Sequence, residues 1–317
     1  MKKLYLFIPL FALAFGVSAQ QEQMYTQFMF NKLAYNPGYA GSFVSPTLTA
    51  IYRNQWMGLD GAPKVMSLSY TQPLLNNRVG IGGNITRQTI GINTNLTIDV
   101  AYAYRVQMKR GTLAVGLQAS MRNIRQNWAD QRIVAIDQND PGIPRDPKSK
   151  FVPNFGAGVY YNAYTERWYA GIALPRIVSN SIDFSEFGEV LSREVQHINA
   201  MGGIKIAATD ELDVTPQVLL RYAIGAPFDA EMNVSAMLYS KFYGGVTYRV
   251  GGDTNFAGES IDAALGFQAI DKLFFCLSYD IGLTRLRKYN NGSIEATVRW
   301  WFNPPDDVVP VKPARPF

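Results

Sequence analysis

Apolar and polar residues alternate with a period of two along nearly the whole of this chain. The last such segment, residues 293–302, reads SIEATVRWWF. One face of it is polar, and the other is apolar with an aromatic end, as a strand in contact with lipid requires. A strand of a soluble sandwich could alternate in the same way, so the recurrence of the pattern decides between the two. The apolar face holds Ile294, Ala296, Val298, Trp300 and Phe302, and the polar face holds Glu295, Thr297 and Arg299.

The first residues have the pattern of an export signal. Lys2 and Lys3 precede an apolar run over residues 4–17, and Val17-Ser18-Ala19 supplies small residues for cleavage. We therefore expect residues 1–19 to be a secretory signal peptide and the mature chain to begin at Gln20. The run is too short for a comfortable membrane-spanning helix. No Cys follows the cleavage site, so a lipid anchor is not expected there.

The mature sequence has no run of about 20 apolar residues, which a membrane-spanning helix needs. The mean hydropathy of -0.07 is close to that of a soluble protein. A β-barrel escapes detection by hydropathy, because each lipid-facing residue is averaged with a lumen-facing one. The single Cys excludes an intrachain disulfide framework. The net charge of +5 is spread along the chain without a Lys/Arg block, so nucleic acid is not an expected partner.

The alternating segments number about fourteen, and each has roughly the length of a barrel strand. The clearest are residues 96–106 and 113–121. Helical periodicity is weak everywhere between residues 47 and 302, which argues against an α/β enzyme. The last segment spans residues 293–302, and the others begin near Leu48, Val65, Val79, Phe155, Trp168, His197, Leu212, Met232, Phe242, Ile261 and Leu273.

The connections between these segments alternate between tight and long. Outer-membrane barrels have short periplasmic turns and longer extracellular loops, and an even strand number places both chain ends in the periplasm. The Pro-rich tail at 303–317 would then lie there too. The longest loop, 125–150, either binds a partner or only covers the barrel. Tight connections are predicted at 74–78, 107–111, 163–167, 208–211, 239–241 and 270–272, and long ones at 56–63, 88–93, 125–150, 175–190, 223–228, 250–260 and 284–291.

An open sheet edge in lipid leaves backbone groups without partners, at several kcal/mol each, so lipid-facing strands must close into a ring. We therefore predict an all-β fold: one transmembrane, antiparallel up-and-down β-barrel over residues 47–302. The inward positions mix small residues with charges of both signs, which indicates internal salt bridges more than a selective ion ring. The predicted inward residues are Gly80, Gly82, Gly116, Gly156, Gly158, Asp99, Arg105, Arg122, Lys205, Asp213, Arg221, Asp262, Asp280, Glu295 and Arg299.

Residues 20–46 depart from the period of two. They are dense in aromatic and other apolar residues and then turn at Asn36-Pro37-Gly38. A loose tail with so much exposed apolar surface would associate with other molecules. Two placements remain open: a short plug in the barrel mouth or lumen, and a periplasmic helix packed on a partner. The apolar residues are Met24, Tyr25, Phe28, Met29, Phe30, Leu33 and Tyr35.

Patterns of catalytic or metal-binding residues are scarce. The only His, His197, and the only Cys, Cys276, cannot form a zinc site of the usual composition, and we expect both to pack inward. The GIGG stretch at 80–83 lacks the third glycine and the helix of a dinucleotide loop. Residues 137–142 resemble a calcium loop weakly, since Lys148 stands where a bidentate Glu is needed. We predict no catalytic, cofactor-binding or metal residues, and no enzyme.

Several sequence motifs of this chain resemble those of a known family. They are YTQFMFNKLAYNPGYAGS at 25–42, YRNQWMGLDGAP at 52–63, SYTQPL at 69–74 and the closing SYDIGLTRLRKYNNGSIEATVRWWF at 278–302. Together they strongly resemble the PorP/SprF family, outer-membrane components of the type IX secretion system. The resemblance covers essentially the whole mature chain. The tail after Phe302 extends beyond the point where many members stop.

The resemblance implies a role in exporting or retaining cell-surface proteins, and in some members a role in gliding motility. The implied partners are outer-membrane lipid, an adhesin or other secreted protein with a C-terminal sorting domain, and periplasmic secretion components linked to peptidoglycan. No catalytic residues carry over. Two other classes stay open. A diffusion channel needs a continuous polar lumen, and an outer-membrane enzyme such as a lipid hydrolase needs a Ser/His pair on one rim.

Overall fold

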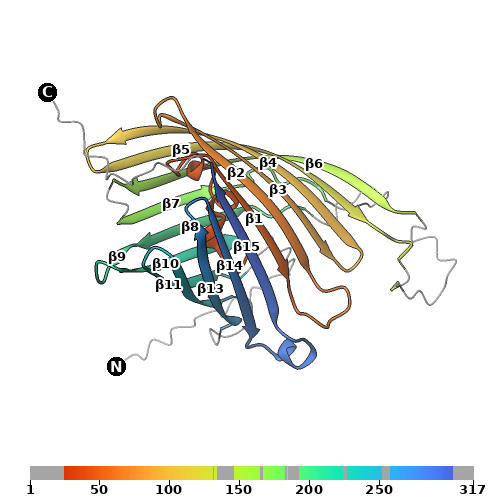
Figure 1. The fold of residues 1–317 in the computed structure, drawn as a ribbon. Helices are drawn as coiled ribbons and strands as arrows, with labels where there is room; N and C mark the ends of the chain where they lie inside the picture. Colours follow the sequence, from red (N-terminus) through yellow and green to blue (C-terminus); the bar gives the residue numbers. More distant parts are fainter. Residues whose placement is uncertain are drawn as a thin grey trace, which may run out of the picture.

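A computed structural model describes residues 25–130, 132–133, 146–164, 167–182, 184, 193–223, 227–251 and 258–302. The predicted signal peptide at 1–19, the calcium-like residues 137–142 and the tail at 303–317 lie outside these ranges. The described residues form a closed barrel whose strands run between a short-turn end, at the left of Figure 1, and a long-loop end.

Every strand of the barrel pairs with antiparallel neighbours, and the last strand pairs with the first. β8 and β9 are separated by Lys205 alone and both pair with β10, so they act as one interrupted strand of the barrel. Because β8 and β9 share one position, the fifteen strands of the described ranges make a fourteen-stranded ring, which confirms the predicted barrel. The strands are β1 (Thr47–Asn54), β2 (Lys64–Leu74), β3 (Val79–Ile90), β4 (Asn93–Met108), β5 (Gly111–Gln126), β6 (Lys148–Ala163), β7 (Trp168–Leu174), β8 (His197–Ile204), β9 (Ile206–Ala207), β10 (Leu212–Ala223), β11 (Asp229–Leu238), β12 (Phe242–Val250), β13 (Ser260–Ile270), β14 (Leu273–Gly282) and β15 (Ser293–Trp301).

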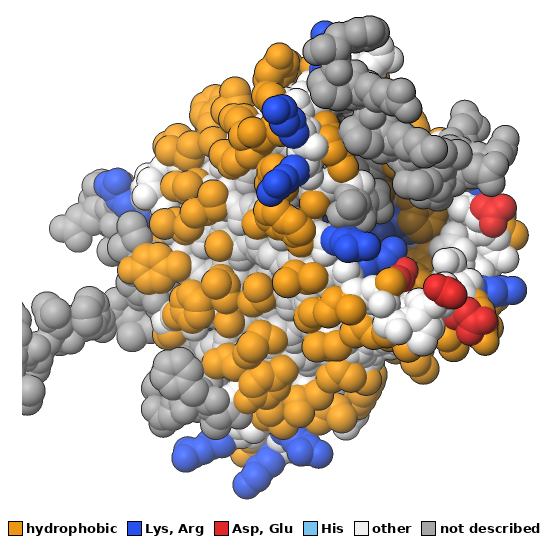
Figure 2. All heavy atoms as spheres, turned by 90° about the vertical axis from the view of Figure 1, so that its left-hand side faces the viewer, with side chains coloured by type: hydrophobic (Ala, Val, Ile, Leu, Met, Phe, Trp, Pro, Cys, Tyr) orange, Lys and Arg blue, Asp and Glu red, His pale blue; other side chains and the backbone are white. Residues whose placement is uncertain are grey.

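The alternation places apolar side chains on the outer wall and polar side chains in the lumen. On β4, Val100 is 61% exposed, whereas its neighbour Asp99 is 8% exposed. This is the reverse of a soluble protein and is the arrangement that a barrel surrounded by lipid requires. Broad hydrophobic areas cover much of the described surface in Figure 2, with Lys and Arg in small groups between them and along the lower edge.

The seam of the barrel lies between β1 and β15, where Leu48 stands opposite Trp300. Outward aromatic side chains gather near the short-turn end of the strands. Trp300 contacts Phe302 with ring centroids 6.5 Å apart, and Tyr161 stacks on Trp168 at 4.7 Å. Such rings suit the boundary between hydrocarbon and headgroups, where amphipathic aromatic side chains concentrate.

One predicted long connection is in fact a tight turn. Residues 88–93 were expected to form an irregular loop, but β3 and β4 extend through them and leave only Gly91 and Ile92 between the strands. Gly91 adopts a φ of +54°, which a two-residue hairpin turn commonly needs and which glycine adopts at no steric cost. The β1–β2 loop stabilises this turn, because the N–H of Gly91 donates to the carbonyl of Gly61 at 2.8 Å.

β5 and β6 are longer than the sequence pattern indicated. β5 was predicted to end at Met121 and β6 to begin near Phe155, yet the two strands pair as far as Gln126 and Lys148. The added stretch of β5 has the polar outward residues Asn123 and Arg125, so its apolar alternation stops while the strand continues. The added stretch of β6 still carries an outward Phe151, which is 69% exposed, beside the outward Ser149. The two strands therefore extend further toward the long-loop end than their regular alternation indicated.

Candidate functional site

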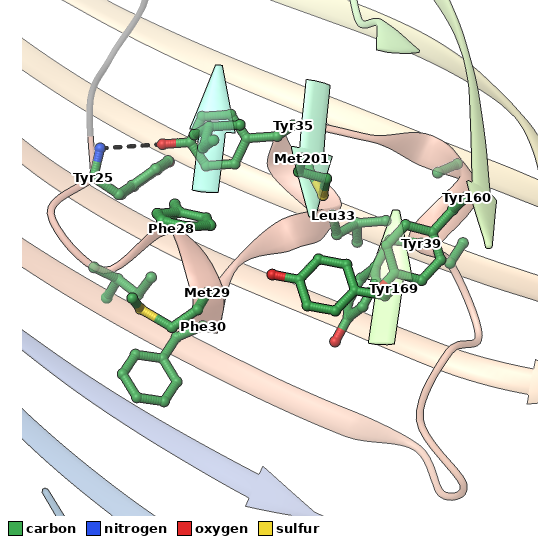
Figure 3. Close-up of a cluster of buried hydrophobic side chains, with 14 of the residues drawn as sticks. Tyr25, Phe28, Met29, Phe30, Leu33, Tyr35, Tyr39, Tyr160, Tyr169 and Met201 are labelled. Carbon is green, nitrogen blue, oxygen red and sulfur yellow. Dashed lines mark hydrogen bonds between the residues drawn. The ribbon is translucent and has the colours of Figure 1, made fainter. Parts of the chain in front are cut away.

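The lumen of the barrel is occupied by the chain's own N-terminal region. Residues 25–43, here called the plug segment, form three short 3-10 helices: η1 (Phe28–Phe30), η2 (Lys32–Ala34) and η3 (Pro37–Tyr39). Figure 3 shows their side chains packed against Tyr160, Tyr169 and Met201 of the wall. The plug segment and wall residues thus share one hydrophobic cluster inside a barrel whose lumen is otherwise polar. The buried members from the plug segment are Tyr25, Phe28, Met29, Phe30, Leu33, Tyr35, Tyr39 and Ala40.

A carboxylate of the closing strand holds the beginning of the plug segment. The two oxygens of Glu295 accept hydrogen bonds from the backbone N–H groups of Thr26 and Gln27, at 2.8 and 2.9 Å. The Gln27 amide donates to Asp262 at 2.7 Å. Glu295 also lies 3.5 Å from the guanidinium of Arg53. Both Glu295 and Arg53 are 1% exposed, so this ion pair and its hydrogen bonds are shielded from water.

Wall side chains also bind backbone carbonyls of the plug segment. Short 3-10 helices leave carbonyl groups without internal partners, and such groups need hydrogen-bond donors when they are buried. Asn199 donates to the carbonyl of Tyr35 at 3.1 Å, and Arg105 donates to that of Ala40 at 3.3 Å. The guanidinium of Arg299 donates to the carbonyl of Phe30. Polar residues of the lumen therefore act as fixed clamps on an otherwise irregular backbone.

Glycines of the wall make room for the plug segment. A methyl carbon added at Gly80 would lie 2.0 Å from the carbonyl oxygen of Ala40. At Gly116 it would lie 2.3 Å from the backbone nitrogen of Gly38, and at Gly158 it would lie 2.3 Å from the side-chain oxygen of Asn36. At these three positions the plug segment thus approaches the wall more closely than a wall side chain would permit.

We expect Gly116→Ala to loosen the plug segment, because overpacking of this kind costs about 1–3 kcal/mol. The readout is the rate of protease cleavage within residues 25–43 of the folded barrel in detergent. Gly244→Ala is the matched control, since nothing lies within 4 Å of a carbon added at that strand glycine. Equal protection of the two variants would show that Gly116 does not seat the segment.

Lys32 lies between aromatic rings of the lumen. Its ammonium nitrogen is 3.6 Å from the ring centroid of Tyr169 and 5.8 Å from that of Tyr39. In the described part of the chain no carboxylate forms a salt bridge with it. Cation–π attraction is therefore its main electrostatic contact, and it ties η2 to the wall at β7.

The predicted internal salt bridges are present. Arg53 lies 2.9 Å from Asp280, and Arg221 lies 3.1 Å from Glu231. Asp99 instead accepts a hydrogen bond from Ser120 at 2.7 Å. Of the other predicted charges, Arg122 pairs with Glu194 at 3.1 Å, and Lys205 pairs with Asp213 at 2.9 Å in a half-exposed position.

His197 and Cys276 are both buried within the barrel. The Nδ1 atom of His197 lies 2.8 Å from the carbonyl of Val195, and Cys276 is a buried member of the core cluster. They lie on β8 and β14, and the GIGG stretch at 80–83 lies inside β3. Among the described residues, no group of three or more His, Cys, Asp and Glu could hold a metal.

A polar pocket of about 490 Å³ opens at the long-loop end. It lies between the β1–β2 loop, the β3–β4 turn and the residues that follow β5. Arg132 bridges these parts: it bonds Asp130 at 2.7 Å and the carbonyl of Gly91 at 2.9 Å. The hydrogen bond from Arg132 lowers the pKa of Asp130 to about 2. The carboxylate therefore stays charged, and the contact persists until the pH falls through about 2.

Comparison with protein-family models accounts for the sequence motifs that resemble a known family. The family model described as "Type IX secretion system membrane protein PorP/SprF" matches residues 17–300. The chain belongs to the PorP/SprF family. This membership confirms the resemblance seen in the sequence, and the matched range includes the plug segment and nearly all of the barrel. None of the curated proteins compared matches the chain.

Solved structures show the fold that this PorP/SprF protein shares. The toluene transporter TbuX of Ralstonia pickettii has a TM-score of 0.50 at 10% identity, covering 84% of this chain and 92% of that chain. A FadL homologue of Pseudomonas aeruginosa has a TM-score of 0.45 at 14% identity, covering 85% and 94%. Omp33 of Acinetobacter baumannii has a TM-score of 0.47 at 6% identity, covering 81% and 98%. At these identities the likeness concerns the barrel fold alone.

Family and fold together place this PorP/SprF protein in the bacterial outer membrane. They are the family and fold of a non-enzymatic outer-membrane barrel. No helix within the described ranges is long and apolar enough to span a membrane.

Proposed function

We propose that this protein supports the export and cell-surface anchoring of a partner protein by the type IX secretion system. The partner is an adhesin or another secreted protein with a C-terminal sorting domain, and in some cells this role includes gliding motility. Membership of the PorP/SprF family carries the proposal. The barrel then acts as a fixed support, because the plug segment packs across its lumen.

In this role the long-loop end holds the partner. Binding on rigid barrels usually resides in loops. The pocket around Arg132 offers polar groups that are already held in place by Asp130 and Gly91. A rim ordered in advance loses little conformational freedom when a folded domain binds to it.

The short-turn end would meet the periplasmic part of the machine. Three neighbouring turns there carry the exposed cations Arg78, Lys109, Arg110 and Arg167. An acidic face on a component linked to peptidoglycan complements such a surface. The tail at 303–317 follows β15 and would add a further contact on that side.

Removal of the gene is expected to lower surface display of the partner at least about ten-fold, since an anchor contributes binding energy of several kcal/mol. Surface proteins are labelled on intact cells and counted by mass spectrometry. Complementation with the wild-type gene should restore display, and outer-membrane proteins without the sorting domain should not change. Undiminished display of every sorting-domain protein would contradict the proposal. Co-purification in mild detergent then identifies the bound partner.

A further inference from the structure

Three cations lie on the outward face of the barrel at the long-loop end. Lys64 of β2, Arg87 of β3 and Arg125 of β5 are exposed, each next to inward-facing neighbours. Within the described ranges none of the three forms a salt bridge with a carboxylate. The remaining outward positions of these strands toward mid-wall are mainly apolar, so the cations mark the outer boundary of the hydrocarbon layer.

The register of the strands brings Lys64 and Arg87 together. Lys64 stands opposite Thr89, and Arg87 stands opposite Met66. The two cations are therefore diagonal neighbours on one face, with Cα atoms about 7–8 Å apart. Two long side chains at this spacing can both reach one anionic group between them.

An apolar groove of about 380 Å³ runs down the outer wall from Arg87. It exists because Ala50 and Ala296 are small beside the bulky Met66, Leu68 and Val298. Ala50 stands opposite Leu68 on β2 and opposite Val298 on β15, so the groove follows the seam of the barrel. Its polar end is at the headgroup level and its apolar end is at the depth of acyl chains.

We propose that Lys64, Arg87 and this groove form a binding site for a phosphorylated lipid of the outer leaflet, of the lipid A type. The phosphate lies between the two cations, and one acyl chain fills the groove beside Ala50 and Ala296. Arg125 continues the basic surface across β4, because it stands opposite Thr94, which in turn stands opposite Thr89. A phosphate with an attached alkyl chain matches both halves of the site, which neither free phosphate nor a neutral lipid does.

The test measures lipid binding to the full-length protein in mild detergent by native mass spectrometry. The double variant Lys64→Gln/Arg87→Gln should bind lipid A at least about ten-fold more weakly, because it loses both charge-assisted contacts. The control is Lys241→Gln/Lys272→Gln, which removes two exposed cations of the β11–β12 and β13–β14 turns at the opposite end. It should bind as the wild type does. Heat-modifiable migration on gels verifies that each variant is a folded barrel.

Two further experiments test the phosphate contact and the acyl-chain contact separately. Dephosphorylated lipid A should bind wild type as weakly as lipid A binds the double variant. Ala50→Trp fills the groove on the lipid side and should weaken lipid A binding, and inorganic phosphate alone should not displace the lipid. Equal binding by the two double variants, equal binding of the dephosphorylated lipid, unaltered binding by Ala50→Trp, or displacement by inorganic phosphate would each overturn the proposed site.

Discussion

Deletion of residues 25–39 is expected to turn a barrel with a blocked lumen into an open pore. The deletion removes all three 3-10 helices from the lumen but leaves the ladder of strands, including the β1–β15 seam, unchanged. The polar clamps that lose the plug segment, such as Glu295 and Arg299, then face water in a wide lumen, so they keep hydrogen-bond partners. A lumen of fourteen strands exceeds what wall side chains alone can fill.

Planar-bilayer recording measures this effect. Single-channel conductance should rise at least about ten-fold above the baseline of the intact protein, because water and ions replace a packed segment. The matched control removes residues 303–317 instead, which follow the barrel rather than precede it. Steady conductance by the intact protein would favour a diffusion channel, and unaltered conductance after the deletion would show that the segment does not close the lumen.

Glu295→Ala is expected to have the largest effect of a single substitution. The plug segment stays in place, but the backbone N–H groups of Thr26 and Gln27 lose their acceptor and Arg53 loses one of its two carboxylates. Because all of these groups are buried, the change should destabilise the protein by about 3–5 kcal/mol. Urea unfolding of the barrel in detergent, followed by tryptophan fluorescence, gives the free energy.

Two further substitutions serve as an intermediate variant and a control for that measurement. Glu295→Gln keeps an acceptor oxygen without the charge and should fall between the wild type and the alanine variant. Glu211→Ala removes an exposed carboxylate in the turn before β10 and should change the free energy of unfolding by less than about 0.5 kcal/mol. An alanine variant at 295 as stable as Glu211→Ala would mean that the clamp contributes nothing.

The barrel was predictable from sequence because its signals are local. The period of two assigns Asp99 to the lumen and Val100 to lipid, and no knowledge of distant residues is needed. The same local signals failed where polar side chains continue a strand, as at the end of β5, and where one glycine makes a turn tight, as at Gly91.

The candidate site depends on contacts that no local pattern contains. The plug segment has neither a helical nor a strand period, so its three 3-10 helices could not be assigned from residues 25–43. Gly80 and Gly116 were recognised as small lumen residues, but nothing in the sequence connects them with Ala40 and Gly38. The position of Glu295 opposite Thr26 likewise appears only when the ring is closed.

The contact between Glu295 and Thr26 joins positions 269 residues apart and therefore sets an order of assembly. A growing chain cannot complete the ring until β15 exists, and the first residues of the plug segment have no carboxylate clamp before that moment. Contacts of such sequence separation form late and slowly. A chain truncated before residue 293 would have two unpaired sheet edges and an unclamped plug segment at once, so both defects would identify the same unfinished molecule.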